Sequence, residues 1–192
     1  MGKKLVTGKN IGKKMVTSTN STRGGSEKTK NPKRFYKRFW TYKRMRKIAE
    51  SIEENINKKY DGKGYVKLHV SESSPSGFYI DVIEVYDDYR GQGIGTEMMN
   101  DIIKEAKRKN VGWIALEAFP KSDGEHPVKG EQIIKLVKWY QRFGFDVDPD
   151  WYEKYTSIDP DKYYYYSESI SGEPNSIWMT MDIVPNWWEY EN

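Results

Sequence analysis

The chain has 192 residues, of which 36% are hydrophobic, and this suits one domain with an appendage and a core of moderate size. It contains no cysteine, which excludes disulfides and a thiolate nucleophile, and no apolar run approaches the roughly 20 residues of a membrane span. The net charge of +4 hides a basic segment, because residues 1–48 hold 16 Lys and Arg against Glu27 alone. The basic N-terminus lacks the apolar segment of a signal peptide, so we expect a cytoplasmic protein with no membrane partner.

Residues 1–32 are expected to form a basic, disordered N-terminal arm, and residues 33–192 to form the folded domain. The end of the arm is rich in Ser, Thr, Asn, Gly and Lys, a composition that buries too little apolar surface to fold. After the arm, apolar residues recur every three or four positions and predict one amphipathic helix over about 33–58. They are Phe35, Phe39, Tyr42, Met45, Ile48, Ile52 and Ile56.

The first half of this helix, KRFYKRFWTYKRMRK, interleaves aromatic with cationic side chains and supports two interpretations. One is a nucleic-acid surface over residues 1–47 that uses phosphate charge and base stacking. That interpretation predicts an affinity that falls steeply with salt. The other is an amphipathic helix whose aromatic side packs into the core while its basic side faces solvent.

Two predicted strands follow the helix. Residues 65–71 alternate apolar and polar side chains, and the Ser-Pro-Ser-Gly turn at 74–77 returns the chain, which predicts an antiparallel hairpin. The second strand, residues 80–85, is rich in branched apolar residues. We expect it to be largely buried and to carry Asp81 and Glu84 as placed carboxylates.

A tight glycine-rich turn over residues 90–95 separates this strand from another predicted helix. Apolar residues at helical spacing mark the helix: Met98, Met99, Ile102, Ile103 and Ala106. A strand, a glycine turn and a helix in this order point several backbone N–H groups at one spot, with the helix dipole behind them. The order predicts an anion site suited to phosphate, where a Cβ on Gly93 or Gly95 would hold the phosphate away from the backbone.

Spacing separates three phosphate-binding motifs at this turn. The Walker pattern needs Gly-Lys-Ser/Thr at its end, and here Thr96 and Glu97 follow Gly95. The dinucleotide fingerprint needs its third glycine where Thr96 stands. The pattern that fits is Arg-x-x-Gly-x-Gly over residues 90–95, which resembles the pyrophosphate loop of the GNAT superfamily of acyl-CoA-dependent N-acyltransferases.

Further elements follow in the C-terminal half. Residues 113–119 (WIALEAF) predict a strand parallel to residues 80–85, because a helix connects the two. Residues 120–130 form a predicted polar loop. A second helix, marked by apolar residues between 133 and 143, is expected to end at Gly144.

The resemblance extends into these elements. Leu116-Glu117-Ala118 is similar to a Leu-Glu strand of the superfamily, residues 140–145 to its Tyr-x-x-x-Gly-Phe helix end, and residues 177–184 to its closing strand. The match covers residues 65–185. It implies an α/β, GNAT-like acyl-CoA N-acyltransferase fold with a mixed, mostly antiparallel sheet flanked by helices.

The resemblance also implies a site for acetyl-CoA as co-substrate. In the family, backbone groups of the central strand bind the pantetheine arm, amides of the loop bind the pyrophosphate, and the two strands beside the arm splay apart. The matching positions here are Ile83, Glu84, Val85, Arg90, Gly91, Gln92, Gly93, Ile94, Gly95 and Thr96.

Two catalytic residues follow from the same resemblance. Tyr140 stands where many members place a tyrosine that protonates the departing thiolate, and a phenol can supply that proton. Glu117 matches the carboxylate that the family's ribosomal-protein N-terminal acetyltransferases use as base, with Asp81 and Glu84 as rivals. For Tyr140 the alternative is a packing role, and for Glu117 a solvated strand-edge carboxylate. Direct attack of the amine in one ternary complex is the family's usual course.

The sequence departs from the family in three places. Ile133 stands where the family often has an asparagine, so the resemblance does not imply a second cofactor contact at this position. The usual first strand and paired early helices are reduced to the arm and one helix. Residues 148–176 insert a long segment that includes four consecutive tyrosines at 163–166. Its aromatic residues suit an acceptor pocket, a homodimer interface or packing on the sheet.

The chain is therefore interpreted as an N-acetyltransferase that moves an acetyl group from acetyl-CoA to a primary amine on a small molecule or peptide. Beyond residue 48 the charge balance is −11, which favours a cationic acceptor. No metal is expected, because His69 and His126 are the only histidines and cysteine is absent. The rival interpretation is a non-catalytic nucleic-acid-binding protein that uses its basic arm on a GNAT-like scaffold.

Overall fold

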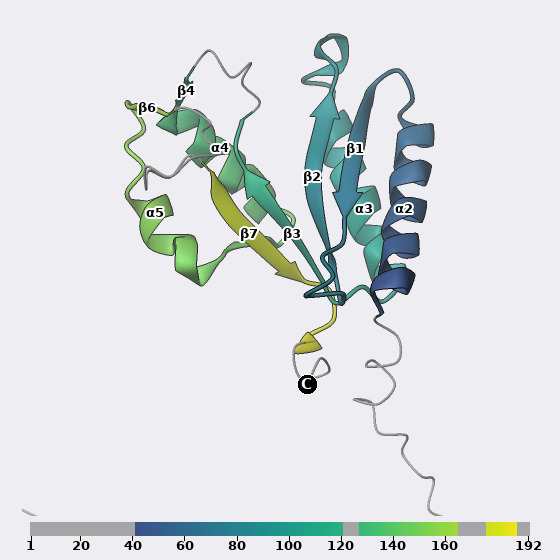
Figure 1. The fold of residues 1–192 in the computed structure, drawn as a ribbon. Helices are drawn as coiled ribbons and strands as arrows, with labels where there is room; N and C mark the ends of the chain where they lie inside the picture. The colour runs from purple at the N-terminus through teal and green to yellow at the C-terminus, as the bar shows by residue number, and fades with distance from the viewer. Residues whose placement is uncertain (1–40, 121–126, 165–175, 188–192) are drawn as a thin grey trace, which may run out of the picture. The chain divides into compact units, whose positions relative to one another are not determined.

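The structure, a computed structural model, describes residues 41–120, 127–164 and 176–187 (Figure 1). The chain divides into two compact units, Met1–Lys30 and Asn31–Asn192, and every described residue belongs to the second. The predicted basic arm therefore lies outside the described residues, together with most of the predicted nucleic-acid surface. None of the helices in the described segments is both long and apolar enough to cross a membrane.

Helix α2 (Tyr42–Lys59) begins at a defined cap. Thr41 has extended backbone angles (φ −114°, ψ 146°), so the prediction of one helix over 33–58 is wrong at this residue. The Thr41 carbonyl accepts the first helical hydrogen bond, from Met45 N at 2.8 Å, as an N-cap residue does. The buried side chains of α2 recur at helical spacing: Met45, Ala49, Ile52 and Ile56. A truncation that removes the basic arm should stop before Thr41, because deletion to residue 47 would also remove the buried Met45.

Strands β1 (Gly64–His69) and β2 (Phe78–Val85) form the predicted antiparallel hairpin. A β-bulge interrupts their pairing, because β2 carries one extra residue, Asp81, between the partners of Lys67 and Leu68. A bulge of this kind bends its strand and increases the local twist.

A 3₁₀ turn, η1 (Asp87–Tyr89), and helix α3 (Ile94–Arg108) connect β2 to β3 (Trp113–Ala118). Strands β2 and β3 run parallel, as predicted. The buried residues of α3 are the five that the apolar spacing predicts: Met98, Met99, Ile102, Ile103 and Ala106.

The expectation that residues 80–85 are largely buried is wrong. Strands β2 and β3 pair only where residues 78–80 face residues 114–116. Ile80 is buried, Asp81 is exposed, and residues 82–85 are half-buried. The exposure begins where the pairing with β3 ends.

The remaining elements follow in the order β4 (Val128–Lys129), α4 (Gly130–Gln141), β5 (Asp146–Val147), η2 (Pro149–Trp151), α5 (Tyr152–Thr156), β6 (Tyr163–Tyr164) and β7 (Ile177–Asp182). The predicted polar loop over 120–130 is wrong in its last part, because β4 pairs with β6 and Gly130 opens α4. Residues 121–126 of that loop lie outside the described residues. The end of the second predicted helix near Gly144 is confirmed, since this glycine has a left-handed φ of +98°.

The insertion packs against the domain at one of its tyrosines. Tyr164 is buried, and its hydroxyl accepts a hydrogen bond from Asp159 N at 2.9 Å. Tyr163 is exposed, with Lys129 Nζ 5.6 Å from its ring centroid. Tyr164 therefore has the packing role considered for this segment, whereas residues 165–175 lie outside the described residues.

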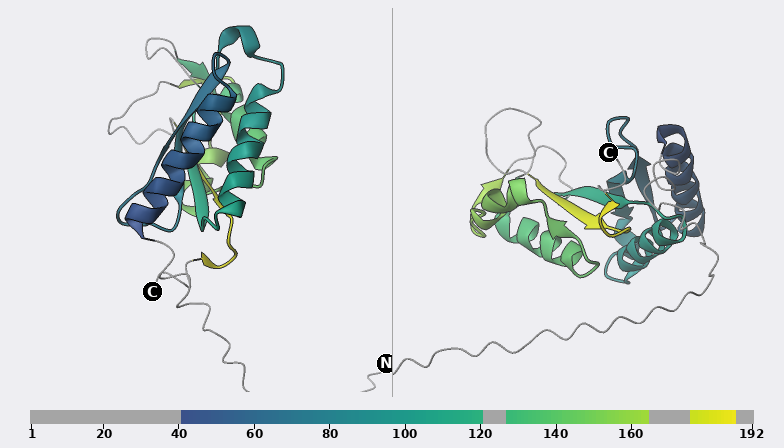
Figure 2. Two further views of the ribbon diagram at one scale, coloured as in Figure 1. Left: turned by 90° about the vertical axis from the view of Figure 1, so that its right-hand side faces the viewer. Right: turned by 90° about the horizontal axis from the view of Figure 1, so that it is seen from below.

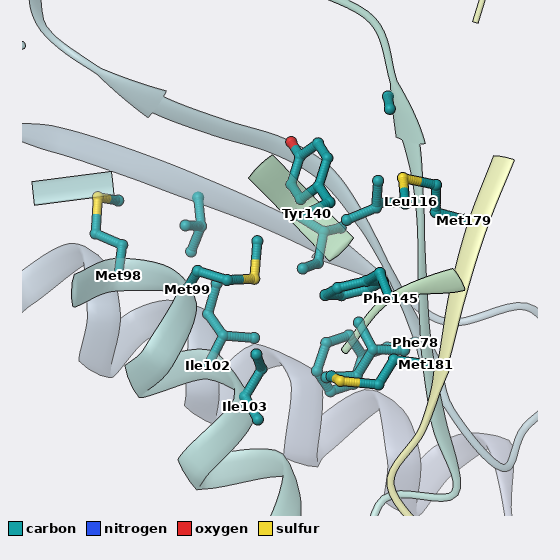
Figure 3. Packing of buried hydrophobic residues seen from close by; sticks show 14 of the residues in the cluster. Phe78, Met98, Met99, Ile102, Ile103, Leu116, Tyr140, Phe145, Met179 and Met181 are labelled. Carbon is teal, nitrogen blue, oxygen red and sulfur yellow. The ribbon is translucent and has the colours of Figure 1, made fainter. Parts of the chain in front are cut away.

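The five-stranded sheet has the order β1-β2-β3-β7-β5, and only the β2–β3 pair is parallel. This confirms the mixed, mostly antiparallel α/β sheet. Helices α2, α3 and α4 lie on one side of the sheet (Figure 2) and share one buried apolar cluster with the strands (Figure 3). The alternate strand residues form the opposite, open face, where Tyr79, Trp113 and Trp178 make edge contacts.

Packing on this open face requires glycine at position 77, because a Cβ added to Gly77 would overlap both the ring and the carbonyl oxygen of Trp113. Gly77→Ala should lower the free energy of unfolding by about 1–3 kcal/mol, the usual effect of overpacking a filled site. Gly95→Ala is the matched control, because its Cβ would meet Val85 and Trp139 at ordinary distances of 3.5 and 3.8 Å. Denaturant unfolding measures both variants. An unchanged midpoint for Gly77→Ala would contradict the packing described.

Candidate functional site

The site begins where β2 and β3 separate, a point we call the fork. Ile80 opposite Leu116 is the last pair between the two strands, and they diverge beyond it (Figure 1). Beyond the fork, β2 stays paired with β1 as far as Val85, and β3 stays paired with β7 as far as Ala118. Each strand is therefore held from its outer side while the inner edges part.

A pocket of about 410 Å³ lies at the fork. Its walls combine two carboxylates, two aromatic rings, a guanidinium and the backbone of β2: Tyr65, Asp81, Val82, Ile83, Glu84, Val85, Arg90 and Phe119. A second pocket of about 290 Å³ lies at the glycine turn, lined by Val85, Tyr89, Arg90, Gly91, Gly93, Ile94, Gly95, Thr96 and Trp139. The two pockets meet at Val85 and Arg90, which line both.

The glycine turn leaves the first amides of α3 without helical acceptors. Gly93 is the N-cap of α3, and its carbonyl accepts a hydrogen bond from Glu97 N at 3.0 Å. The Glu97 amide is therefore the first in α3 that donates to a carbonyl of the helix or its cap. The N–H groups of the three preceding residues, 94–96, point out of the helix start along its dipole. This geometry suits a phosphate-type anion.

Two glycines of the turn are required by their backbone conformation, a reason that adds to the close phosphate approach expected from the sequence. Gly91 and Gly93 have left-handed φ angles of +74° and +83°. A Cβ added to either glycine would have no other protein atom within 4 Å. The backbone conformation is therefore what demands glycine at these two positions. Gly95 is helical, and its Cβ would make ordinary contacts with Val85 and Trp139.

Arg90 contributes to holding the turn. Its Nε donates to the Val85 carbonyl at 3.1 Å, and its guanidinium pairs with Asp87 at 2.9 Å. Both partners of that ion pair are well exposed, so the pair adds little stability. The hydrogen bond to Val85 connects the turn to the end of β2, at the place where the two pockets meet.

The structure brings the predicted cofactor positions together, with one exception. Each of them lines one of the two pockets except Gln92, whose side chain donates to the Asp88 carbonyl at 2.9 Å. Sequence reasoning missed Tyr89, Trp139, Tyr65 and Phe119 as lining residues. Only Trp139 carried a signal, since it directly precedes Tyr140 on the apolar side of a predicted helix.

Tyr140 lies on α4 and is 6% exposed. Its ring makes edge contacts with Trp139 (4.8 Å) and Phe145 (6.0 Å), and its hydroxyl points away from Phe145 (Figure 3). Within the described part of the chain, that hydroxyl has no hydrogen-bond partner, and Tyr140 lines neither of the two pockets. Burial raises the pKa of the phenol, so it stays protonated at neutral pH and can act as a proton donor.

The three candidate bases lie in different surroundings. Glu117 on β3 is exposed, accepts a hydrogen bond from Ser176 Oγ at 2.8 Å, and lines neither pocket. Asp81 and Glu84 both line the fork pocket. Asp81 also contacts His69, with 2.5 Å between Oδ1 and Nδ1. No group of three or more potential metal ligands occurs within the described residues.

Comparison with known proteins places the chain among acetyltransferases. The model of the acetyltransferase (GNAT) family matches residues 29–145. A curated relative, the uncharacterized N-acetyltransferase ycf52 of Gracilaria tenuistipitata var. liui, is 26% identical over 120 residues, which span 58% of this chain and 57% of the relative. The chain thus matches little more than half of that relative's length.

Solved structures of acetyltransferases are also similar at low identity. The ribosomal-protein-S18-alanine N-acetyltransferase from Escherichia coli is 17% identical, with a TM-score of 0.41 and coverage of 64% of each chain. A GNAT family acetyltransferase from Elizabethkingia anophelis with acetyl-CoA bound is 20% identical, with a TM-score of 0.38 and coverage of 62% of this chain and 68% of that one.

The left-handed conformation of Gly93 generates a testable prediction. Gly93→Ala should lower the free energy of unfolding by about 1–2 kcal/mol, the cost of placing an ordinary side chain at such an angle. Gly93→Asn should lose less, because asparagine visits this conformation more readily. Denaturant unfolding of both variants measures the difference. Equal losses would show that the φ angle is not what makes glycine necessary there.

Proposed function

This chain belongs to the acetyltransferase (GNAT) family, and on that premise we propose that it transfers an acetyl group from acetyl-CoA to a primary amine. The observation that carries the proposal is the continuity of two features. The amides at the start of α3 have a geometry that suits an anion, and the pocket beside them shares Val85 and Arg90 with the pocket at the fork between β2 and β3. An extended molecule with a phosphate group at one end and a reactive group at the other fits this arrangement.

The residues present fit acetyl-CoA. The amides of Ile94, Gly95 and Thr96 would hold its pyrophosphate, since a helix start supplies both N–H donors and a favourable dipole. The backbone of β2 from Ile83 to Val85 would bind the pantetheine amides along the edge that has parted from β3. When bound, acetyl-CoA supplies an activated thioester whose sulfur leaves as a thiolate.

Tyr140 is proposed as the proton donor to that thiolate. A general acid must still carry its proton at the working pH, and burial of the Tyr140 ring favours the neutral phenol. Among the described residues, none is hydrogen-bonded to this hydroxyl. Its rigid surroundings, Trp139 and Phe145, hold the ring in one orientation.

Glu117 is proposed as the base that takes a proton from the amine. It lies on the open face of the sheet, whereas Tyr140 comes from a helix on the opposite face. Acid and base would thus act from the two sides of the fork, with direct attack in a ternary complex. The surplus of acidic residues beyond residue 48 favours a cationic acceptor, a small amine or a basic peptide.

Release of free thiol from acetyl-CoA, measured over a panel of primary amines, tests this function. Tyr140→Phe should lower kcat by about 10²-fold or more, because it removes the proposed acid and leaves the ring in place. Tyr60→Phe is the control, since the Tyr60 side chain is also buried but its hydroxyl pairs with Asp101 at 2.8 Å, on the α2–α3 side. Failure of the parent protein to release thiol with any amine would contradict the proposed function. Full activity of Tyr140→Phe would contradict only the role of the tyrosine.

A further inference from the structure

Two carboxylates flank the fork on the open face of the sheet. Asp81 directly follows Ile80, and Glu117 directly follows Leu116, and these two apolar residues form the last pair between β2 and β3. Asp81 and Glu117 are therefore the first residues on each side of the opening. Asp81 lines the fork pocket, and neither carboxylate belongs to the buried apolar cluster on the helical side.

A chain of ring contacts shows that the two carboxylates share one face. The His69 ring, whose Nδ1 contacts Asp81, stacks on Tyr79 at 4.6 Å with an interplanar angle of 12°. Tyr79 in turn makes an edge contact with Trp178 at 5.7 Å, and Trp178 is the cross-strand partner of Glu117.

His69 fixes the orientation of Asp81. The bulge makes Asp81 the extra residue of β2, so strand pairing does not determine where its side chain points. The 2.5 Å contact from His69 Nδ1 to Asp81 Oδ1, together with the stacking of the imidazole on Tyr79, supplies that constraint. An imidazole held by stacking can donate from Nδ1 and leave the second carboxylate oxygen directed elsewhere.

We propose that His69 is a positioning residue, which holds Asp81 at the fork pocket so that its second carboxylate oxygen contacts the ammonium group of the acceptor. The inference rests on the proposed function and deepens it, since it names a residue that positions a carboxylate for the acceptor. Two carboxylates recognise an ammonium ion by charge-assisted hydrogen bonds. Arylamines, which are neutral at pH 7, lack that charge and should be poor acceptors.

The proton balance is consistent with two carboxylates. An ammonium nitrogen carries three protons and the product amide nitrogen carries one, so two protons leave the nitrogen. Asp81 takes the first proton and passes it to solvent, which frees the lone pair. Glu117 takes the second as the C–N bond forms and the C–S bond breaks, and the departing sulfur receives a proton from Tyr140. Proton exchange with solvent then restores Glu117 and Tyr140, so that one proton is released per turnover.

The test compares His69→Leu with His69→Asn in the full chain. Leucine removes the donor, whereas the asparagine Nδ2 group can replace the imidazole Nδ1–H toward Asp81. With 1,4-diaminobutane, n-butylamine and aniline as probe acceptors, His69→Leu should raise KM for the aliphatic amines about tenfold, the usual effect of losing a hydrogen bond to a charged group. His69→Asn should stay within about twofold of the parent. The KM for acetyl-CoA should not change, which also reports that the variant is folded.

Asp182→Asn is the matched control. Asp182 lies on β7, and its Oδ1 accepts a hydrogen bond from a ring N–H, that of Trp187, at 2.7 Å, so it resembles Asp81 without lying at the fork. Its kinetics should match those of the parent. Equal effects of His69→Leu and His69→Asn, no effect of His69→Leu, or aniline turned over as well as n-butylamine would overturn the inference and leave the proposed function intact. Absence of turnover by the parent would overturn both.

Discussion

The separation of β2 from β3 after a single short run of pairs is the constraint on which the rest of the site depends. Hydrogen-bonded pairing between two parallel strands in the middle of a sheet ordinarily continues along both strands. Between β2 and β3 this pairing stops at Ile80 and Leu116. The bulge at Asp81 adds a residue to β2 at this point and turns the strand, while β1 and β7 hold the outer edges in place. Backbone groups that would bond a neighbouring strand instead face a pocket between strands that are both rigidly supported.

Helix packing determines what this opening connects to. The apolar side of α3 is buried from Met98 to Ala106, which fixes the helix start and the glycine turn before it. The turn is then tied to the end of β2 through Arg90 and Val85. On α4, burial of Ile133 and Val137 places Trp139 against the turn and Tyr140 in the core. The glycine turn, the opening between β2 and β3, and the Tyr140 phenol therefore all depend on one apolar cluster.

Local patterns in the sequence predicted the elements that form this scaffold, and non-local contacts explain the errors. The spacing of apolar residues identified the buried side of α3 because amphipathic periodicity is a local property. The sequence around Val128 and Lys129 predicts a loop, because the strand with which they pair lies in the insertion more than thirty positions away. The extended Thr41 was missed because apolar spacing continues across it. Gly93 was identified as essential, but only the φ angle shows that conformation demands the glycine. The His69–Asp81 contact requires a hairpin register with a bulge, which no sequence pattern shows.

Binding of acetyl-CoA by the turn at the start of α3 together with the fork is what the proposed function requires. Calorimetric titration of acetyl-CoA into the parent protein, Gly93→Glu and Gly62→Glu tests this binding most directly. Gly62 also has a left-handed φ, +70°, with nothing within 4 Å of its Cβ, but it lines neither pocket, so both variants introduce the same strain and charge. We expect a dissociation constant on the order of micromolar for the parent and for Gly62→Glu, and no binding by Gly93→Glu. Absence of binding to the parent protein, or undiminished binding by Gly93→Glu, would contradict a cofactor site at this turn.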